Sequence, residues 1–186
     1  MDRTEMLRVL AKHRTDEIVV TTMTTTWMWP SITNNPDLDY PAYGVMAQGA
    51  SIGLGIALGR PDRKVLVLNG DGSQLMHLGS IVSIANAGAK NLVLFVVQND
   101  QYEMTGGQPI PMAGKIDFAS AGKALGMKNG YRFDDPSEFD TELPHILREE
   151  GPTIVALRVS GPLGERRRPN MKQEVRRFRE MMLKLA

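Results

Sequence analysis

The chain has 186 residues, a formal charge of +1 at pH 7 and no cysteine. This length suits one sizeable domain with its own core, the near-neutral charge argues against a nucleic-acid partner, and the lack of cysteine excludes disulfides, zinc–thiolate sites and a thiol nucleophile. No apolar run reaches the roughly 20 residues of a membrane-spanning helix, and the first residues lack the basic-then-apolar pattern of a secretion signal, so we expect a cytoplasmic protein without membrane contact.

Short β-branched runs alternate with helical patterns along the chain, which predicts a parallel sheet with helices on its faces. We expect strands at residues 18–22, 65–68, 92–97 and 154–159, with a weaker one at 130–133. The four stronger runs are apolar without alternation, as is typical of strands covered on both sides. The predicted fold class is therefore α/β, a three-layer sandwich with a mainly parallel sheet.

Besides a helix through Leu75, Leu78, Ile81 and Ile84 that ends at Gly88 and joins two of these strands, four helices are predicted from their patterns and end signals. Residues 44–59 are nearly all small or apolar, so we expect a buried helix closely approached by other backbone. A second helix begins near Asp117 and ends before Gly126, and a third follows the N-cap Asp135 and ends before Gly151. The fourth is an amphipathic C-terminal helix.

The domain boundaries follow from a change of composition near the end of the chain. We expect one domain at residues 1–165, then a basic link that opens residues 166–186 and leads into the C-terminal helix. The apolar face of that helix favours docking on its own domain, and a contact with another subunit is the alternative.

Polar side chains follow two neighbouring strands of the predicted sheet. The strand at 65–68 runs into Asp71, a helix follows, and the next strand runs into Asn99. Such a β-α-β unit crosses over with a right hand, so both strand ends open on the same edge of the sheet. We therefore expect Asp71 and Asn99 to be neighbours in space.

These residues predict a site for magnesium and a diphosphate. A carboxylate, an amide oxygen and a turn carbonyl are hard donors that suit Mg²⁺. Gly70 and Gly72 allow the backbone to approach a ligand, and Ser73 lies where a helix starts and exposed amides attract an anion. An EF-hand is the weaker interpretation, because Val82 stands where its last glutamate would be, and no Walker sequence occurs.

The segment at 70–73, the following apolar strand and Asn99 together resemble the cofactor motif of thiamine-diphosphate enzymes, in their diphosphate-binding domain. Residues 94–102 look like the strand and turn of the 2-oxo acid decarboxylase branch. The resemblance implies that Asp71, Asn99 and the backbone carbonyl of Gln101 bind the metal ion. Gln98 departs from the first asparagine that is common in the family, while the ligand position at Asn99 is kept.

The resemblance extends upstream of this motif. Residues 43–47 are similar to the family segment in which a glycine carbonyl binds the aminopyrimidine and a large apolar side chain bends the cofactor, which implicates Gly44 and Met46. The threonines at 21–25 resemble the loop that gives hydroxyls to the diphosphate, which implicates Thr24 and Thr25. Met46 as plain core and the threonines as turn-stabilising residues are the alternatives.

A narrower resemblance concerns residues 75–79 and 106–109, which look like the diphosphate-binding half of phosphonopyruvate and sulfopyruvate decarboxylases. It implies a carboxy-lyase that acts on a small 2-oxo acid, with His77 as a residue that could face the substrate. A lone histidine on a helix is otherwise commonly structural.

Enzymes of this family need a glutamate that activates the cofactor, and a separate pyrimidine-binding (PYR) domain supplies it. The chain has room for one such domain, so the resemblance implies a β-type subunit that pairs with a PYR-domain α-type subunit in a hetero-oligomer. Two alternatives stay open. The chain could belong to another thiamine-diphosphate enzyme, a carboligase or an oxo-acid oxidoreductase, or it could be a non-catalytic diphosphate-binding domain.

Overall fold

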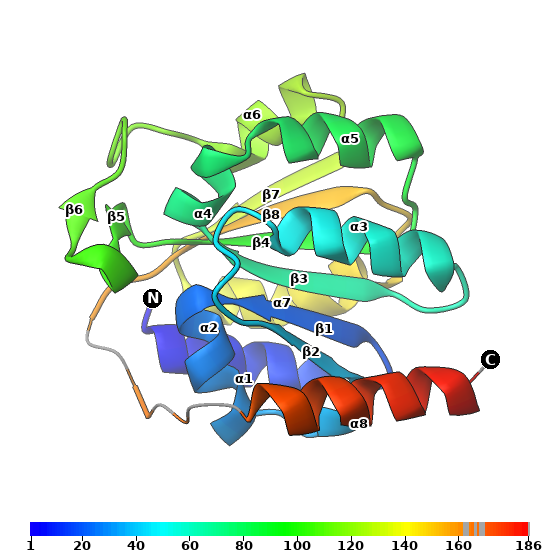
Figure 1. Cartoon of the computed structure of the whole chain (residues 1–186). Helices are drawn as coiled ribbons and strands as arrows, with labels where there is room; N and C mark the ends of the chain where they lie inside the picture. The colour runs from blue at the N-terminus through cyan, green and yellow to red at the C-terminus, as the bar shows by residue number, and fades with distance from the viewer. Residues whose placement is uncertain (162–163, 166, 168–169, 186) are drawn as a thin grey trace.

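A parallel sheet between two layers of helices forms the body of the chain in the computed structural model, which describes residues 1–161, 164–165, 167 and 170–185 (Figure 1). Within these residues six strands pair in one parallel sheet in the order β2-β1-β3-β4-β8-β7. In that order the strands are β2 (Asp39–Ala42), β1 (Ile18–Thr22), β3 (Val65–Gly70), β4 (Leu92–Gln98), β8 (Thr153–Arg158) and β7 (Asn129–Phe133). The predicted α/β class with a parallel sheet is confirmed.

Helices cover both faces of the sheet. One face carries α3 (Gly49–Gly59), α5 (Gly79–Ala87), α6 (Phe118–Ala124) and α8 (Met171–Lys184). The other carries α1 (Arg3–His13), α7 (Pro136–Arg148), the end of α2 (Met23–Met28) and the 3₁₀ turn η1 (Trp29–Ser31). The remaining short elements are η2 (Pro36–Leu38), α4 (Asp71–Met76), η3 (Glu103–Thr105) and an antiparallel pair of β5 (Gln101–Tyr102) with β6 (Gln108–Pro109).

Alternate residues of each central strand point into the two cores. Along β4, Leu94 and Val96 pack under α3 and α5, whereas Phe95 and Val97 pack on the α1 and α7 side. Both sets are almost completely buried, and this explains why the central strands show no polar alternation in the sequence. All five predicted strands are present.

The edge strand β2 and the helix α1 were not predicted. Residues 39–42 include Asp39 and Pro41, a composition that argues against a central strand but is tolerated at the edge of a sheet. The first helix does carry a recognisable signal, since the side chain of its N-cap Asp2 accepts from the backbone N–H of Glu5.

The predicted glycine-rich helix is shorter and less buried than expected. Residues 44–48 form turns, in which Gly44 and Ala47 have positive φ, and α3 starts at Gly49. A Cβ atom on Gly53 would collide with the side chain of Val67, so the close approach of other chain is confirmed on this side.

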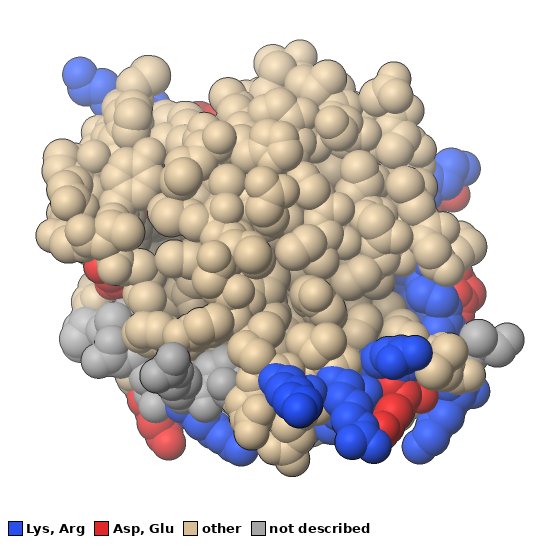
Figure 2. Space-filling model, in the orientation of Figure 1, with Lys and Arg blue, Asp and Glu red and all other residues tan. Residues whose placement is uncertain are grey.

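The outer side of α3 faces solvent. Leu58 is 56% exposed there, and Val82 of the neighbouring α5 is 48% exposed. Figure 2 shows no charged side chains over the middle of the face that these helices form. The prediction that the helix is buried on all sides is therefore wrong for this chain by itself.

The helix α8 docks on its own domain, as the stronger of the two expectations had it. Phe178 is buried against Tyr40 of β2, with ring centroids 5.3 Å apart in an edge-to-face arrangement. Residues 166, 168 and 169 of the predicted basic link lie outside the described residues. No helix in the described part of the chain has the length and apolar character to cross a membrane.

Candidate functional site

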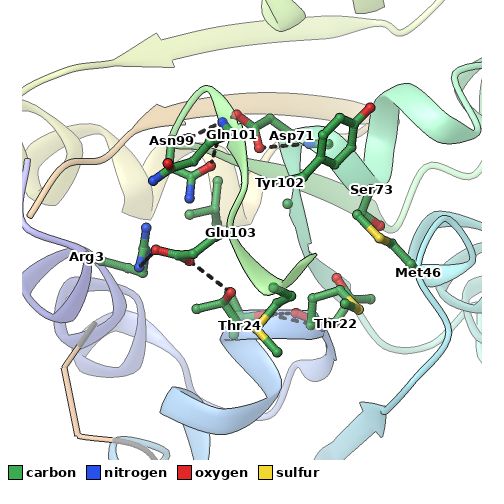
Figure 3. A pocket seen from close by; sticks show the side chains of 16 residues that line it. Arg3, Thr22, Thr24, Met46, Asp71, Ser73, Asn99, Gln101, Tyr102 and Glu103 are labelled. Carbon is green, nitrogen blue, oxygen red and sulfur yellow. Dashed lines mark hydrogen bonds and ion pairs between the residues drawn. The ribbon is translucent and has the colours of Figure 1, made fainter. Parts of the chain in front are cut away.

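A cavity opens at the carboxyl ends of the central strands β1, β3 and β4, where the loops after these strands meet (Figure 3). Its described lining comprises Arg3, Thr22, Met23, Thr24, Thr25, Met46, Gly70, Asp71, Gly72, Ser73, Val97, Asn99, Gln101, Tyr102, Glu103 and Met104. Open α/β sheets bind ligands at this edge because the loops there are free to vary while the strands hold them in place. The cavity brings together nearly all the residues that the sequence singled out.

Asp71 is the centre of the site. Its Oδ2 atom accepts the backbone N–H of Asn99 at 3.0 Å and that of Asp100 at 2.6 Å, and its Oδ1 atom accepts from Gly72 at 2.7 Å. The expected meeting of the loops that carry Asp71 and Asn99 is therefore confirmed. Burial raises the pKa of this carboxyl to about 6, because the desolvation of its charge outweighs the three backbone hydrogen bonds that it accepts.

The turn after β4 supplies the neutral oxygens. The side-chain oxygen of Asn99 accepts the backbone N–H of Gln101 at 3.2 Å, so it is held within the turn, and both residues line the cavity beside Asp71. No group of three or more histidine, cysteine or acidic side chains that could hold a metal ion occurs among the described residues. A cation bound here would be held by one carboxylate and by neutral oxygens, a set that suits Mg²⁺ when phosphate oxygens complete it.

The hydroxyl groups around the cavity differ in whether they already donate a hydrogen bond within the chain. Ser73 accepts the backbone N–H of Ala47 at 2.9 Å and keeps its own proton for a ligand. Thr24 donates to Glu103 at 3.1 Å. The hydroxyl of Thr25 lies 2.8 Å from the carbonyl of Thr22 and 3.0 Å from that of Leu68, so this side chain satisfies the backbone of the turn.

Gly72 lines the cavity, and its lack of a side chain also has a packing role. A Cβ atom at this position would lie 2.5 Å from the ring of Tyr102, so the missing side chain makes room for an aromatic ring. The ring and Gly72 both line the cavity. The expectation that the Gly72 backbone approaches a ligand stays a prediction.

Two expected residues lie outside this cavity. Gly44 lines a smaller apolar pocket next to it, together with Trp27 and Tyr43, and the two pockets share Met23 and Met104.

His77 ends α4 and is not part of the lining of either pocket. Its carbonyl accepts from the hydroxyl of Ser80 at 2.7 Å, in the break that divides the single predicted helix into α4 and α5. A catalytic role for His77 stays a prediction without support from its position.

Arg3 and Glu103 belong to the site although the sequence assigned neither a role in binding. The guanidinium of Arg3 lies 3.2 Å from one carboxylate oxygen of Glu103, and the other oxygen accepts from Thr24. Arg3 comes from the start of α1, a hundred residues before its partner. No local pattern connects two residues so far apart.

A family model described as "Thiamine pyrophosphate enzyme, C-terminal TPP binding domain" matches residues 21–157. A sulfopyruvate decarboxylase subunit beta of Methanococcus maripaludis is 34% identical over 155 residues, which cover 83% of this chain and 82% of that subunit. A phosphonopyruvate decarboxylase of Streptomyces viridochromogenes is 32% identical over 175 residues, covering 92% of this chain and 44% of that protein. A second one, from Streptomyces hygroscopicus, is 34% identical and is covered to 36% of its length. The chain thus spans less than half of these two decarboxylases.

Solved structures share the fold. A benzoylformate decarboxylase from Polynucleobacter necessarius superimposes with a TM-score of 0.73 over 89% of this chain and 34% of that one, at 23% identity. A thiamine diphosphate-dependent 4-hydroxybenzoylformate decarboxylase of Rhodococcus jostii RHA1 gives a TM-score of 0.70 at 19% identity, over 88% of this chain and 33% of that one. At this level of identity the likeness concerns the fold.

Proposed function

This chain belongs to the thiamine pyrophosphate (thiamine diphosphate) enzyme family as its C-terminal cofactor-binding domain, and from this we propose that it is the diphosphate- and magnesium-binding subunit of a two-chain 2-oxo acid decarboxylase. The substrate we propose is a small 2-oxo acid with a further acidic group, of the sulfopyruvate or phosphonopyruvate type. The names of the relatives that are 32% to 34% identical support this choice.

The observation that carries the proposal is the contact between Asp71 and the turn at Asn99. It joins the two halves of the motif within hydrogen-bonding distance, 3.0 Å from the carboxylate oxygen to the amide nitrogen. The donor set fits a magnesium diphosphate, because burial raises the pKa of this carboxyl and a bound cation would stabilise its ionised form. We propose that Asp71, the side chain of Asn99 and the carbonyl of Gln101 hold the ion.

Other residues of the cavity would hold the organic part and the phosphates. We propose that Ser73 and Thr24 donate to phosphate oxygens and that Met46 bends the cofactor, and the position of all three in the lining of one cavity supports this. When bound, thiamine diphosphate supplies the electron sink on which a 2-oxo acid loses carbon dioxide. The chain itself would hold the cofactor in position, with a hydrophobic wall on one side and a fixed carboxylate for the metal ion.

We further propose that a second chain with a PYR domain completes the site and brings the activating glutamate. The name "subunit beta" of the relative from Methanococcus maripaludis, of which this chain covers 82%, supports that division.

The surface beside the cavity supports the same division. Residues 43–59 and 72–89 contain no aspartate, glutamate, lysine or arginine. They form the uncharged face over α3, α4 and α5, and Val45, Met76 and Val82 are exposed on it (Figure 2). The same segments reach the cavity at Met46 and Ser73. We propose that this face is where the second chain docks, because a large uncharged surface next to a binding cavity is typical of an interface.

Copurification followed by an activity assay tests the proposal. The complex is supplied with Mg²⁺ and thiamine diphosphate, and release of carbon dioxide is followed with sulfopyruvate, phosphonopyruvate and pyruvate, the last as a matched substrate without the second acidic group. We expect turnover by the complex with one of the acidic substrates and little with pyruvate or with the isolated chain. Turnover by the isolated chain would contradict the two-chain assembly. Condensation products would indicate a carboligase, and cofactor binding without any reaction would indicate a non-catalytic domain.

A further inference from the structure

A buried arginine lies next to the site and is not explained by the proposed function. Arg3 is 2% exposed, and its described partner in an ion pair is Glu103, whose side chain is 18% exposed. Removing a guanidinium from water is costly unless its donors are used, and this group has five N–H donors. A single hydrogen bond at 3.2 Å to Glu103 uses one of them.

The position of the ion pair connects it to anion binding. Arg3, Thr24 and Glu103 all line the cavity that contains Asp71 and Ser73, and Figure 3 shows Arg3 and Glu103 on one side of the space, across from Ser73 and Met46 and below Asn99 and Gln101. The carboxylate of Glu103 therefore receives one guanidinium and one hydroxyl donor inside the cavity. Guanidinium and hydroxyl groups are also the donors that phosphate oxygens prefer.

Space and charge both favour the departure of Glu103 when a phosphate binds. The cavity has a volume of about 40 Å³, room for a few water molecules. With Asp71 on one side, a second carboxylate from Glu103 would repel a diphosphate at close range, whereas Arg3 would attract it. Glu103 stands in the short turn η3, which is followed by two glycines with positive φ, Gly106 and Gly107, in an exposed loop.

We propose that Arg3 is a ligand of the cofactor's diphosphate, and that Glu103 occupies the place of a phosphate oxygen until the diphosphate displaces it. The inference rests on the proposed function and adds a cationic side chain, that of Arg3, to the proposed site. When the diphosphate binds, a phosphate group replaces the carboxylate of Glu103 as the acceptor of the hydrogen bonds from Arg3 and Thr24. Arg3 stays paired throughout, and the loop that bears Glu103 is released toward the mouth of the cavity.

Titration calorimetry with magnesium pyrophosphate as the probe tests this on the full chain, together with any subunit that copurifies. We expect Arg3→Met to weaken binding about 10- to 100-fold, the range for loss of a charge-assisted hydrogen bond. Glu103→Gln should tighten binding several-fold, because the competing charge is removed while the shape is kept. Arg8→Met is the matched control, since Arg8 lies exposed on the same helix and should leave the affinity unchanged.

Arg3→Met and Glu103→Gln are expected to shift the affinity for magnesium pyrophosphate in opposite directions. A general loss of structure cannot produce this pair of results. Should Arg3→Met lower the melting temperature strongly, Arg3→Lys and Glu103→Gln decide the matter, with lysine expected to restore part of the affinity. Unchanged affinity in both Arg3 variants, or weaker binding by Glu103→Gln, would overturn the inference. Asp71→Asn is measured alongside. If the native chain binds no magnesium pyrophosphate, or if Asp71→Asn binds it as well as the native chain does, the proposed function fails and this inference fails with it.

Discussion

Replacing Asp71 with alanine tests the centre of the site, because this one carboxylate connects two loops. The substitution removes the acceptor of three backbone N–H groups, those of Gly72, Asn99 and Asp100. It also removes the side chain that we propose as the charged ligand of the metal ion. We therefore expect a loss of stability and a loss of cation-dependent binding from the same change.

The size of the stability effect follows from two opposing terms. A buried N–H group left without an acceptor costs about 1–3 kcal/mol, and three such groups lose their partner. The rise of the Asp71 pKa from 3.8 to about 6 is the net of burial and of the hydrogen bonds that oppose it, and it corresponds to a cost of roughly 3 kcal/mol for keeping this carboxylate ionised at neutral pH, which alanine relieves. A net destabilisation of about 3 kcal/mol is expected. For a chain of this size it lowers the melting temperature by roughly 6–12 °C.

Thermal unfolding with and without Mg²⁺ and thiamine diphosphate measures both effects. Ligand at about 100 times its Kd should stabilise the native chain, or its complex, by about 2.7 kcal/mol, and Asp71→Ala should show no such rise. Asp71→Asn is the matched variant, because it keeps one acceptor oxygen and the shape, so it should melt closer to the native chain yet also lose the response. An Asp71→Ala chain that melts like the native one and still responds to the ligands would refute this reasoning.

Three further experiments test the packing, the docking face and an ion pair. Gly53→Ala should lower stability by about 1–3 kcal/mol because its Cβ collides with strand β3, whereas Gly55→Ala on the open side of the same helix should raise it by about 0.5–1 kcal/mol, and unfolding in urea compares the two. Val82→Glu should prevent copurification of the second chain and leave the melting temperature nearly unchanged, and retention of the partner would contradict the docking face. Lys12 and His13 hold the pKa of Asp140 below its ordinary 3.8, so this ion pair stabilises the fold above pH 3.8 and loses its effect as the pH falls through the lowered pKa. The native chain should accordingly have a higher melting temperature than Asp140→Asn at pH 7. The two melting temperatures should become equal at a pH below the lowered pKa of Asp140.

The central sheet could be predicted from the sequence because its strands are continuous apolar runs between clear breaks. The run at residues 92–97 contains no polar residue, and the structure extends it by one residue only. The edge strand β2 lacked this signal, since Asp39 and Pro41 interrupt it. The break between α4 and α5 was also missed. A side-chain network of Gln74 and Ser80 stabilises this break, and its one local signal, Gly79 at the start of α5, is weak because an isolated glycine is tolerated inside a helix.

The candidate site could be predicted where its residues follow strands, and not where they depend on tertiary packing. Asp71 and Asn99 follow adjacent parallel strands, so topology alone brings them together. Arg3 and Glu103 meet only because α1 docks beside the edge of the sheet, which no local pattern specifies. The packing role of Gly72 was not predicted for the same reason, because the ring of Tyr102 beside it comes from a later loop.

The three hydrogen bonds that Asp71 accepts fix the carboxylate in one rotamer in the folded chain. The entropy of ordering both loops has therefore been lost during folding and does not weaken the later encounter with a cation. Affinity at such a rigid acceptor depends on charge and on dehydration of the incoming ion more than on any closing motion. With magnesium bound as proposed, such a fixed carboxylate would favour small, hard cations without any movement of the surrounding loops.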